Sequence, residues 1–125
     1  MFEVGVVGHF EAAHRLRGNF GPATRRHGHT YRVEVSARGH TLRPDGALFD
    51  ITRIQEALRE VTGSLHYQDL DELAELADQN TTAETLAHHI FERIATRVAA
   101  PDLTWLGVRL WESPDAYASY AEEFA

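Results

Sequence analysis

The sequence predicts an α+β protein in which a four-stranded antiparallel sheet carries two helices on one face, in the order ββααββ. Two segments with strand patterning open the chain, two with helical periodicity occupy its middle, and two further strand-like segments close it. The chain has 125 residues, 43% of them hydrophobic, with no linker, repeat or low-complexity tract. We therefore expect a single domain over residues 1–125 with one core.

The first two strands are expected on either side of a loop. Residues 2–12 are rich in Val and Phe, and His14 shares a face with the apolar side chains if the strand extends that far. Gly, Asn and Pro at 18–22 predict the loop. Residues 27–37 alternate apolar and polar side chains, which is the period of two of a half-buried strand.

The first helix is predicted directly after Asp50. Apolar residues recur at intervals of three and four over residues 51–61. Thr52 and Gln55 have the spacing of a capping box, and Gly63 is expected to end the helix.

The second helix and the last two strands complete the predicted order. A continuous apolar stripe begins near residues 80–82 and predicts a helix that Pro101 ends. Residues 103–111 and 117–124 are predicted as strands. Exposed edges of the resulting sheet would favour strand-to-strand assembly.

Composition excludes several classes of protein. The chain has no cysteine, which excludes disulfides, zinc–thiolate sites, iron–sulfur clusters and thiol nucleophiles. Its net charge is -7 and its basic residues are dispersed arginines, so we expect no nucleic-acid partner. The N-terminal segment lacks a leader pattern, and no apolar run approaches the ~20 residues that span a bilayer, so we expect a cytoplasmic protein without a membrane partner.

Three histidines have the spacing of metal ligands. His27 and His29 flank Gly28 at the start of a predicted strand, so both imidazoles lie on one face. His14 ends the preceding strand and comes opposite them if the two strands pair antiparallel. Three neutral imidazoles with an open fourth position form a catalytic zinc arrangement, although edge-strand histidines without a metal remain an alternative.

Five short motifs extend this interpretation over nearly the whole chain. In order, they are Phe10-Glu-Ala-Ala-His14-Arg-Leu16, His27-Gly-His29-Thr-Tyr31-Arg-Val33, Gly46-Ala-Leu-Phe-Asp50, Thr82-Ala-Glu84-Thr-Leu-Ala87 and Trp111-Glu112-Ser-Pro114. In these motifs and their order the chain resembles the 6-pyruvoyltetrahydropterin synthase and 6-carboxytetrahydropterin synthase family. The resemblance implies a tunnelling fold (T-fold), in which ββααββ subunits form a trimeric barrel and two trimers stack as a hexamer.

The resemblance also assigns site residues. The family's zinc ligands fall on His14, His27 and His29. Its pterin-anchoring glutamate falls on Glu112, and Glu84 and the backbone around Thr82 are implied to lie near the pterin. A carboxylate suits this role because it accepts two hydrogen bonds, from the 2-amino group and the ring N–H.

Two departures from the family pattern concern catalysis. The family's catalytic cysteine, four residues before the His-x-His, is replaced by Ala23. The family's Asp-His pair after the first helix falls on His66 and Tyr67, or on Leu65 and His66 after a one-residue shift. His66 could act as a general acid or base and Tyr67 could donate a proton to a developing oxyanion, or both could pack between loop and sheet.

Two functions of different classes follow. The first is a zinc-dependent pterin synthase, of the carbon–oxygen lyase type. It acts on the side chain of a dihydroneopterin triphosphate type of substrate by elimination, tautomerisation or retro-aldol cleavage, with a mechanism altered by Ala23. The alternative is a non-catalytic zinc-containing module that binds a pterin or purine. A cupin also uses His-x-His on a strand, but its double-sheet barrel does not accommodate two predicted helices.

Overall fold

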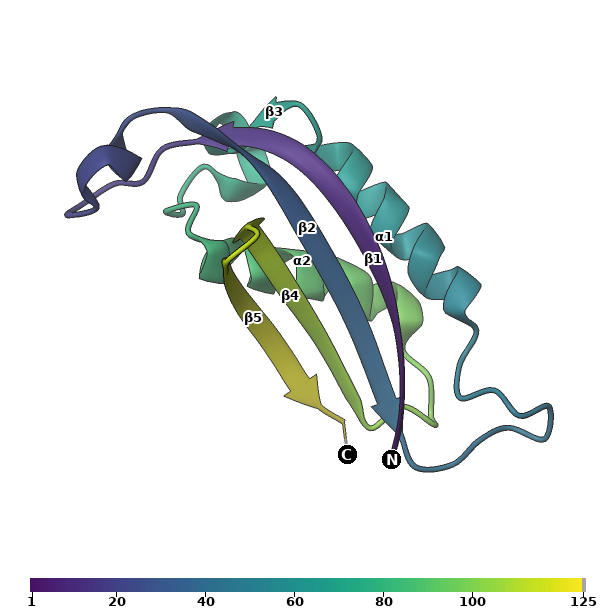
Figure 1. Ribbon diagram of the computed structural model, residues 1–125. Helices are drawn as coiled ribbons and strands as arrows, with labels where there is room; N and C mark the ends of the chain where they lie inside the picture. The colour runs from purple at the N-terminus through teal and green to yellow at the C-terminus, as the bar shows by residue number, and fades with distance from the viewer. Residues whose placement is uncertain (125) are drawn as a thin grey trace.

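The computed structural model describes residues 1–124 and shows one curved sheet with both long helices packed on the same face (Figure 1). Ala125, the last residue of the predicted domain, lies outside the described residues. The strands are β1 (Phe2–His14), β2 (His27–Gly39), β3 (Gln68–Asp69), β4 (Trp105–Ser113) and β5 (Ala116–Glu123). The helices are α1 (Ile51–Leu65) and α2 (Ala83–Val98), with short 3-10 turns η1 (Gly21–Thr24), η2 (Leu70–Glu72) and η3 (Ala74–Leu76).

The sheet has five strands in the order β3-β1-β2-β4-β5, so the prediction of a four-stranded antiparallel sheet is only partly right. The four predicted strands pair antiparallel, but β3 is added parallel to the end of β1, opposite Ala12 and Ala13. A two-residue strand has no alternation that a sequence pattern could reveal. A backbone hydrogen bond of 2.6 Å from the Tyr67 N–H to the Glu11 carbonyl helps to hold β3 against β1.

The β1–β2 hairpin is longer than predicted. Its register is continuous from Phe2 opposite Gly39 to His14 opposite His27. Because β1 reaches His14, the alternation of its side chains carries that residue onto the helix-covered face, where its exposed fraction is only 1%.

The ends of the helices depend on caps that the sequence pattern identified only in part. The predicted capping box of Thr52 and Gln55 is wrong: Asp50 is the cap of α1, and its carboxylate accepts a hydrogen bond from the Thr52 N–H. Gly63 does not end this helix, which continues to Leu65, a fully buried core residue. Helix α2 begins as predicted, with Thr82 as its cap, and ends at Val98 before Pro101.

The hydrophobic core lies between the sheet and the two helices. It contains Val33, Val35, Ile54, Leu58, Ile90 and Ile94, all at most 3% exposed. Phe10 and Tyr31 stack with their ring centroids 4.7 Å apart at the end of the core that lies toward the histidines. Within residues 1–124, none of the helices has both the length and the apolar composition needed to cross a membrane.

Candidate metal centre

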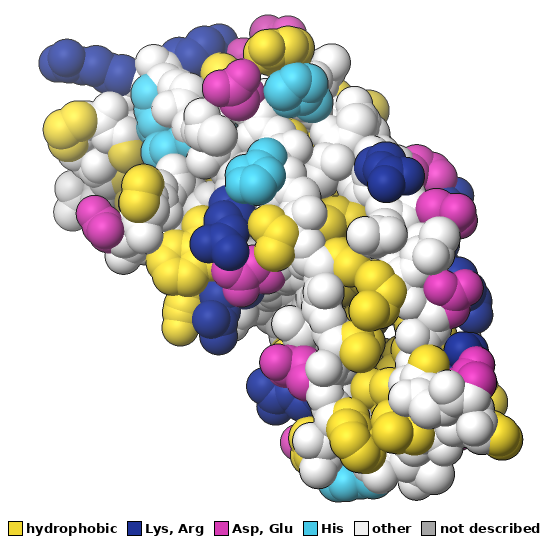
Figure 2. All heavy atoms as spheres, turned by 45° about the vertical axis from the view of Figure 1, so that its right-hand side comes forward, with side chains coloured by type: hydrophobic (Ala, Val, Ile, Leu, Met, Phe, Trp, Pro, Cys, Tyr) yellow, Lys and Arg dark blue, Asp and Glu magenta, His cyan; other side chains and the backbone are white. Residues whose placement is uncertain are grey.

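His14, His27 and His29 converge where β1 finishes and β2 starts. Figure 1 shows that these strand ends lie at the same end of the sheet. Each offers one ring nitrogen, and these three atoms all lie within 4.8 Å of one another. The structure thus brings together the three residues that the His-x-His pattern and the strand pairing predicted. Histidine side chains also gather toward this end in the space-filling view (Figure 2).

Hydrogen bonds fix which ring nitrogen carries the proton in two of the three histidines, His14 and His27. The Nδ1 atom of His14 lies 2.9 Å from the Thr81 carbonyl oxygen, and Nδ1 of His27 lies 2.7 Å from the Arg25 carbonyl oxygen. A carbonyl oxygen only accepts, so both Nδ1 atoms must donate. In the neutral rings the Nε2 lone pairs of these two histidines therefore face each other, at 3.0 Å.

This arrangement fits a cation. Two lone pairs at that distance repel unless a proton or a metal ion lies between them, and neutral imidazoles bind metals through such lone pairs. Burial is the largest cause that lowers the pKa of His14 and of His29, and charge on His27 lowers both further. Both rings are thereby kept in the neutral form that a metal requires.

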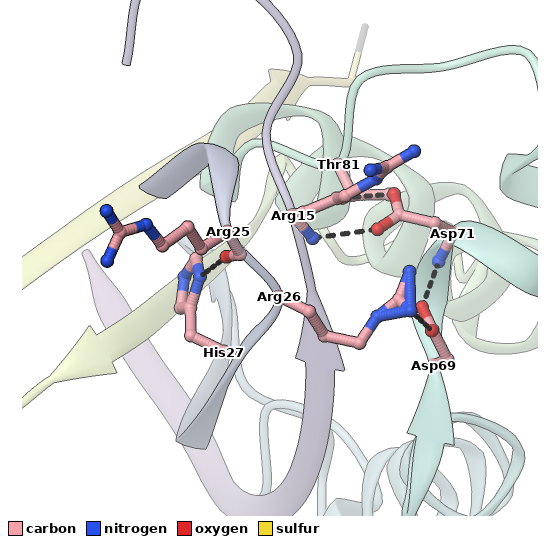
Figure 3. Close-up of polar contacts among 7 residues, drawn as sticks. All are labelled: Arg15, Arg25, Arg26, His27, Asp69, Asp71 and Thr81. Carbon is pink, nitrogen blue, oxygen red and sulfur yellow. Dashed lines mark hydrogen bonds and ion pairs between the residues drawn. The ribbon is translucent and has the colours of Figure 1, made fainter. Parts of the chain in front are cut away.

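Two further residues, Thr81 and Asp71, support the position of His14 through hydrogen bonds, and sequence reasoning missed both. The Thr81 side chain is fully buried, and its hydroxyl donates to an Asp71 oxygen at 2.9 Å. The other Asp71 oxygen accepts from the Arg15 N–H at 2.8 Å. Figure 3 shows these contacts around the end of β1. The position of Thr81 directly before a helix cap was the only sequence feature that marked it.

Glu112 lies beside the triad on β4. The pairing of β4 with β5 shifts between Trp111 and Ser113, which makes Glu112 the extra residue of a β-bulge. Its side chain is half-buried. The Glu112 carboxylate and a backbone hydrogen bond to this residue both act to raise the pKa of His29, against the stronger effect of burial. The predicted ligand anchor and the predicted metal ligands therefore share one neighbourhood.

The two other predicted pterin contacts lie at the start of α2. The Thr82 hydroxyl caps the helix, since it accepts from the Thr85 N–H at 3.2 Å, and it also donates to the Thr85 hydroxyl. Glu84 is exposed in the first turn. The neighbouring Thr81 contacts the triad directly, through His14.

His66 and Tyr67 follow α1, and Tyr67 reaches the site. Tyr67 is 77% exposed and lines an open pocket of about 500 Å³ together with His29 and Asp69. Its φ angle is 57°, a left-handed conformation that an aromatic residue rarely adopts and that is often found at functional sites. The Nδ1 atom of His66 accepts a hydrogen bond from the Glu11 N–H at 3.0 Å.

Ala23 lies in the loop between β1 and β2, inside η1. Its backbone carbonyl accepts from the Leu16 N–H at 2.9 Å, and its N–H donates to the Phe20 carbonyl at 3.2 Å. The side chain is a methyl group in a chain without cysteine, so no thiol stands at this position.

The sheet with two helices on one face and three converging histidines define a T-fold protein with a candidate metal centre. The chain belongs to the 6-pyruvoyl tetrahydropterin synthase family, whose model matches residues 3–123. The family resemblance noted in the sequence is thereby confirmed.

Individual relatives agree with this assignment. The chain is 33% identical over 132 aligned residues to a candidate 6-carboxy-5,6,7,8-tetrahydropterin synthase of Pyrococcus horikoshii, covering 87% of this chain and 83% of that protein. It is 28% identical to the 6-carboxy-5,6,7,8-tetrahydropterin synthase of Haemophilus influenzae, covering 98% of this chain and 100% of that protein. The structure of 6-pyruvoyl tetrahydropterin synthase from Caenorhabditis elegans superposes with a TM-score of 0.83 at 23% identity, covering 98% of this chain and 96% of that one, which supports the fold.

Proposed function

We propose that this protein is a zinc-dependent synthase that acts on the side chain of a reduced pterin of the dihydroneopterin triphosphate type. The observation that carries the proposal is the pair of Nε2 lone pairs of His14 and His27, which face each other at 3.0 Å and require a cation between them. His29 supplies the third nitrogen. When bound, zinc would polarise side-chain oxygens of the substrate and acidify the adjacent C–H bond.

Glu112 is the proposed anchor for the heterocycle. Its half-buried carboxylate lies near His29 and can accept hydrogen bonds from the 2-amino group and a ring N–H of a pterin. Glu84 and the backbone around Thr82 are proposed to lie near the bound pterin, while the Thr82 hydroxyl itself is used in the helix cap.

Arginines beside the triad support a phosphorylated substrate. In a chain of net charge -7, Arg15, Arg17, Arg25 and Arg26 all lie within the segment that joins the end of β1 to the start of β2. The Arg26 side chain is paired with Asp69 at 2.9 Å, whereas Arg25 is exposed beside His27 (Figure 3). Guanidinium groups favour phosphate oxygens as partners.

His66 is the proposed proton-transfer residue, with Tyr67 as the second candidate. Since Nδ1 of His66 accepts the Glu11 N–H, the neutral ring carries its proton on Nε2. In this geometry the Nε2–H can donate a hydrogen bond to a developing oxyanion, and His66 can accept the proton removed from the substrate carbon only through Nδ1, after releasing the Glu11 N–H. The Tyr67 hydroxyl is the further donor, on the pocket that His29 also lines.

A second candidate function is a non-catalytic module that binds zinc and a pterin or purine. The observation that favours it is Ala23, which places a methyl group where the family resemblance implies a catalytic cysteine. Turnover separates the two functions. Zinc-loaded protein would be incubated with dihydroneopterin triphosphate and with dihydroneopterin, and the products followed by mass spectrometry.

Each outcome of this experiment has a definite meaning. A new product that disappears in His66→Ala, with zinc content unchanged, supports the synthase, and the expected loss in turnover is ~10²–10⁴-fold. Unchanged substrate that raises the melting temperature, except in Glu112→Ala, supports the binding module. Neither product nor binding would contradict both. Recovery of activity in Ala23→Cys would indicate that the pocket geometry suits the family reaction.

We also propose that the chain assembles as a trimer or hexamer. β5 is an edge strand, and among residues 1–124 the strand pairing at the other edge of the sheet is limited to β3 with Ala12 and Ala13. Unpaired strand edges favour pairing with another copy. Light scattering at micromolar concentration should report three or six chains, and a monomer would contradict this part of the proposal.

A further inference from the structure

A line of hydrogen bonds runs from Asp71 through Thr81 to Nδ1 of His14. The candidate metal-binding nitrogen of this ring is the other one, Nε2. The Asp71 carboxylate accepts from the Thr81 hydroxyl at 2.9 Å, and that hydroxyl oxygen lies 3.3 Å from Nδ1 of His14. The same Nδ1 atom lies 2.9 Å from the Thr81 carbonyl oxygen. Thr81 and His14 are both buried, so water does not compete freely for these contacts.

The direction of each hydrogen bond in this line is fixed by chemistry. An ionised carboxylate can only accept, so the single hydroxyl proton of Thr81 points toward Asp71. The hydroxyl oxygen then presents lone pairs to His14, as the Thr81 carbonyl also does. The proton of His14 is therefore held on Nδ1, and the lone pair is left on Nε2.

Asp71 is itself held in place by the strand ends that carry the triad. Its second oxygen accepts from the N–H of Arg15, the residue after His14. Its own N–H donates to Asp69 at 3.1 Å, and Asp69 pairs with Arg26, the residue before His27. These contacts are visible together in Figure 3.

We propose that Asp71 is a positioning residue for the candidate metal centre. By accepting the proton of the Thr81 hydroxyl, it keeps that hydroxyl from donating to His14 and so favours the His14 tautomer that carries its proton on Nδ1. The inference rests on the proposed metal site. The Thr81 carbonyl oxygen already favours the proton on Nδ1. Without the carboxylate, the Thr81 hydroxyl is free to rotate and donate to Nδ1, which opposes the carbonyl and favours the proton on Nε2, where it would block the metal-binding lone pair. The carboxylate excludes that arrangement, as outer partners of metal-ligating histidines commonly do.

Substitutions at both ends of the line test the proposal. Asp71→Asn supplies only one acceptor oxygen where the carboxylate supplies two, and Thr81→Val removes the hydroxyl at constant shape. Asp71→Asn should weaken zinc binding by ~10–100-fold, the usual effect of losing such a partner. Thr81→Val should weaken it much less, because no hydroxyl is then left to donate to Nδ1 and the main-chain carbonyl of residue 81 still accepts from it. Thr81→Ser, which keeps the hydroxyl, should bind zinc as the wild type does. The double variant Asp71→Asn/Thr81→Val should regain most of the affinity lost in Asp71→Asn, because the competing donor is absent.

Zinc affinity is measured by competition with a chromophoric chelator, and the visible spectrum of the cobalt-loaded protein reports ligand geometry. Asp78→Asn is the matched control, since Asp78 is exposed and lies outside the line. Affinity equal to wild type in Asp71→Asn would overturn the proposal. So would a double variant that binds zinc as weakly as Asp71→Asn, or a Thr81→Ser variant with altered affinity or an altered cobalt spectrum.

A measurement on the unaltered chain covers the case in which a variant does not fold. Long-range ¹H–¹⁵N NMR of the metal-free protein near pH 8 should show His14 protonated on Nδ1, and an unprotonated Nδ1 would overturn the inference. The same spectrum separates this inference from the proposed function. A wild-type protein that takes up no zinc contradicts the proposed function, while the NMR result still shows which ring nitrogen of His14 carries the proton.

Discussion

Replacing His27 with alanine should remove most of the stabilisation by zinc while leaving the metal-free protein folded. His27 provides one of the three convergent nitrogens, and two imidazoles alone make a weak zinc site. The side chain is only half-buried at the end of a strand, so little packing is lost. Its removal also takes away the lone pair that faces Nε2 of His14 at 3.0 Å, which favours the metal-free fold.

The expected size of the effect follows from binding linkage. Zinc at 100 times its dissociation constant stabilises the folded state by about 2.7 kcal/mol. For a domain of 125 residues, each kcal/mol shifts the melting temperature by roughly 4 °C, so the wild type should gain about 10 °C. If the loss of one ligand weakens binding by about 100-fold, the same zinc concentration stabilises by only ~0.4 kcal/mol, which is about 2 °C.

Thermal melts with and without zinc, together with the metal content after gel filtration, provide the assay. His40→Ala is the matched control, because His40 is exposed just beyond Gly39, at the opposite end of β2. A full shift of about 10 °C in His27→Ala, or loss of the shift in His40→Ala, would refute the assignment of the triad as the zinc site.

Three further predictions concern stability. Tyr31→Phe should raise the unfolding free energy by about 1 kcal/mol, because the buried Tyr31 hydroxyl has no hydrogen-bond partner within residues 1–124; a loss measured by urea denaturation would contradict this. The folded pKa values of His14 and His29 lie below the value of about 6.5 of a free histidine, so the unfolded chain binds more protons just below that pH. The metal-free protein should therefore lose stability as the pH falls from 7 to 5, whereas a flat profile would argue against neutral buried rings. Gly39→Ala should destabilise by ~1–3 kcal/mol in the same assay, since its Cβ would lie 2.5 Å from the Asp102 carbonyl oxygen, and an unchanged midpoint would show that this contact relaxes.

The sequence predicted those parts of the fold and site that depend on local periodicity. Val and Phe content identified β1, alternation identified β2, and the spacing of His27-Gly28-His29 was enough by itself to place two imidazoles on one face. His14 needed one more assumption, antiparallel pairing of the two strands, which the structure confirms. Glu112 was assigned by resemblance alone, since the β-bulge that sets it apart depends on its pairing with β5.

Features that depend on contacts between distant residues could not be predicted in this way. Asp71 lies 56 residues from its partner Arg15, and Thr81 lies 67 residues from His14. An aspartate in an acidic loop and a threonine before a helix have ordinary surface roles in most sequences. Only the folded chain shows that Thr81 contacts His14 and that Asp71 accepts a hydrogen bond from Thr81.

The unbroken pairing of the β1–β2 hairpin has a consequence for how this chain can vary in length. Side chains alternate with a period of two, so inserting one residue within either strand would transfer every side chain on one side of the insertion to the other face. An insertion between Phe10 and His14 would turn His14 away from His27 and His29 and would expose part of the core as well. The loop between His14 and His27 carries no such constraint, because its length does not set which face the histidines occupy. Changes in length should therefore be tolerated in that loop and rejected within the paired segments, a pattern that a library of single-residue insertions, sorted by zinc retention, would reveal directly.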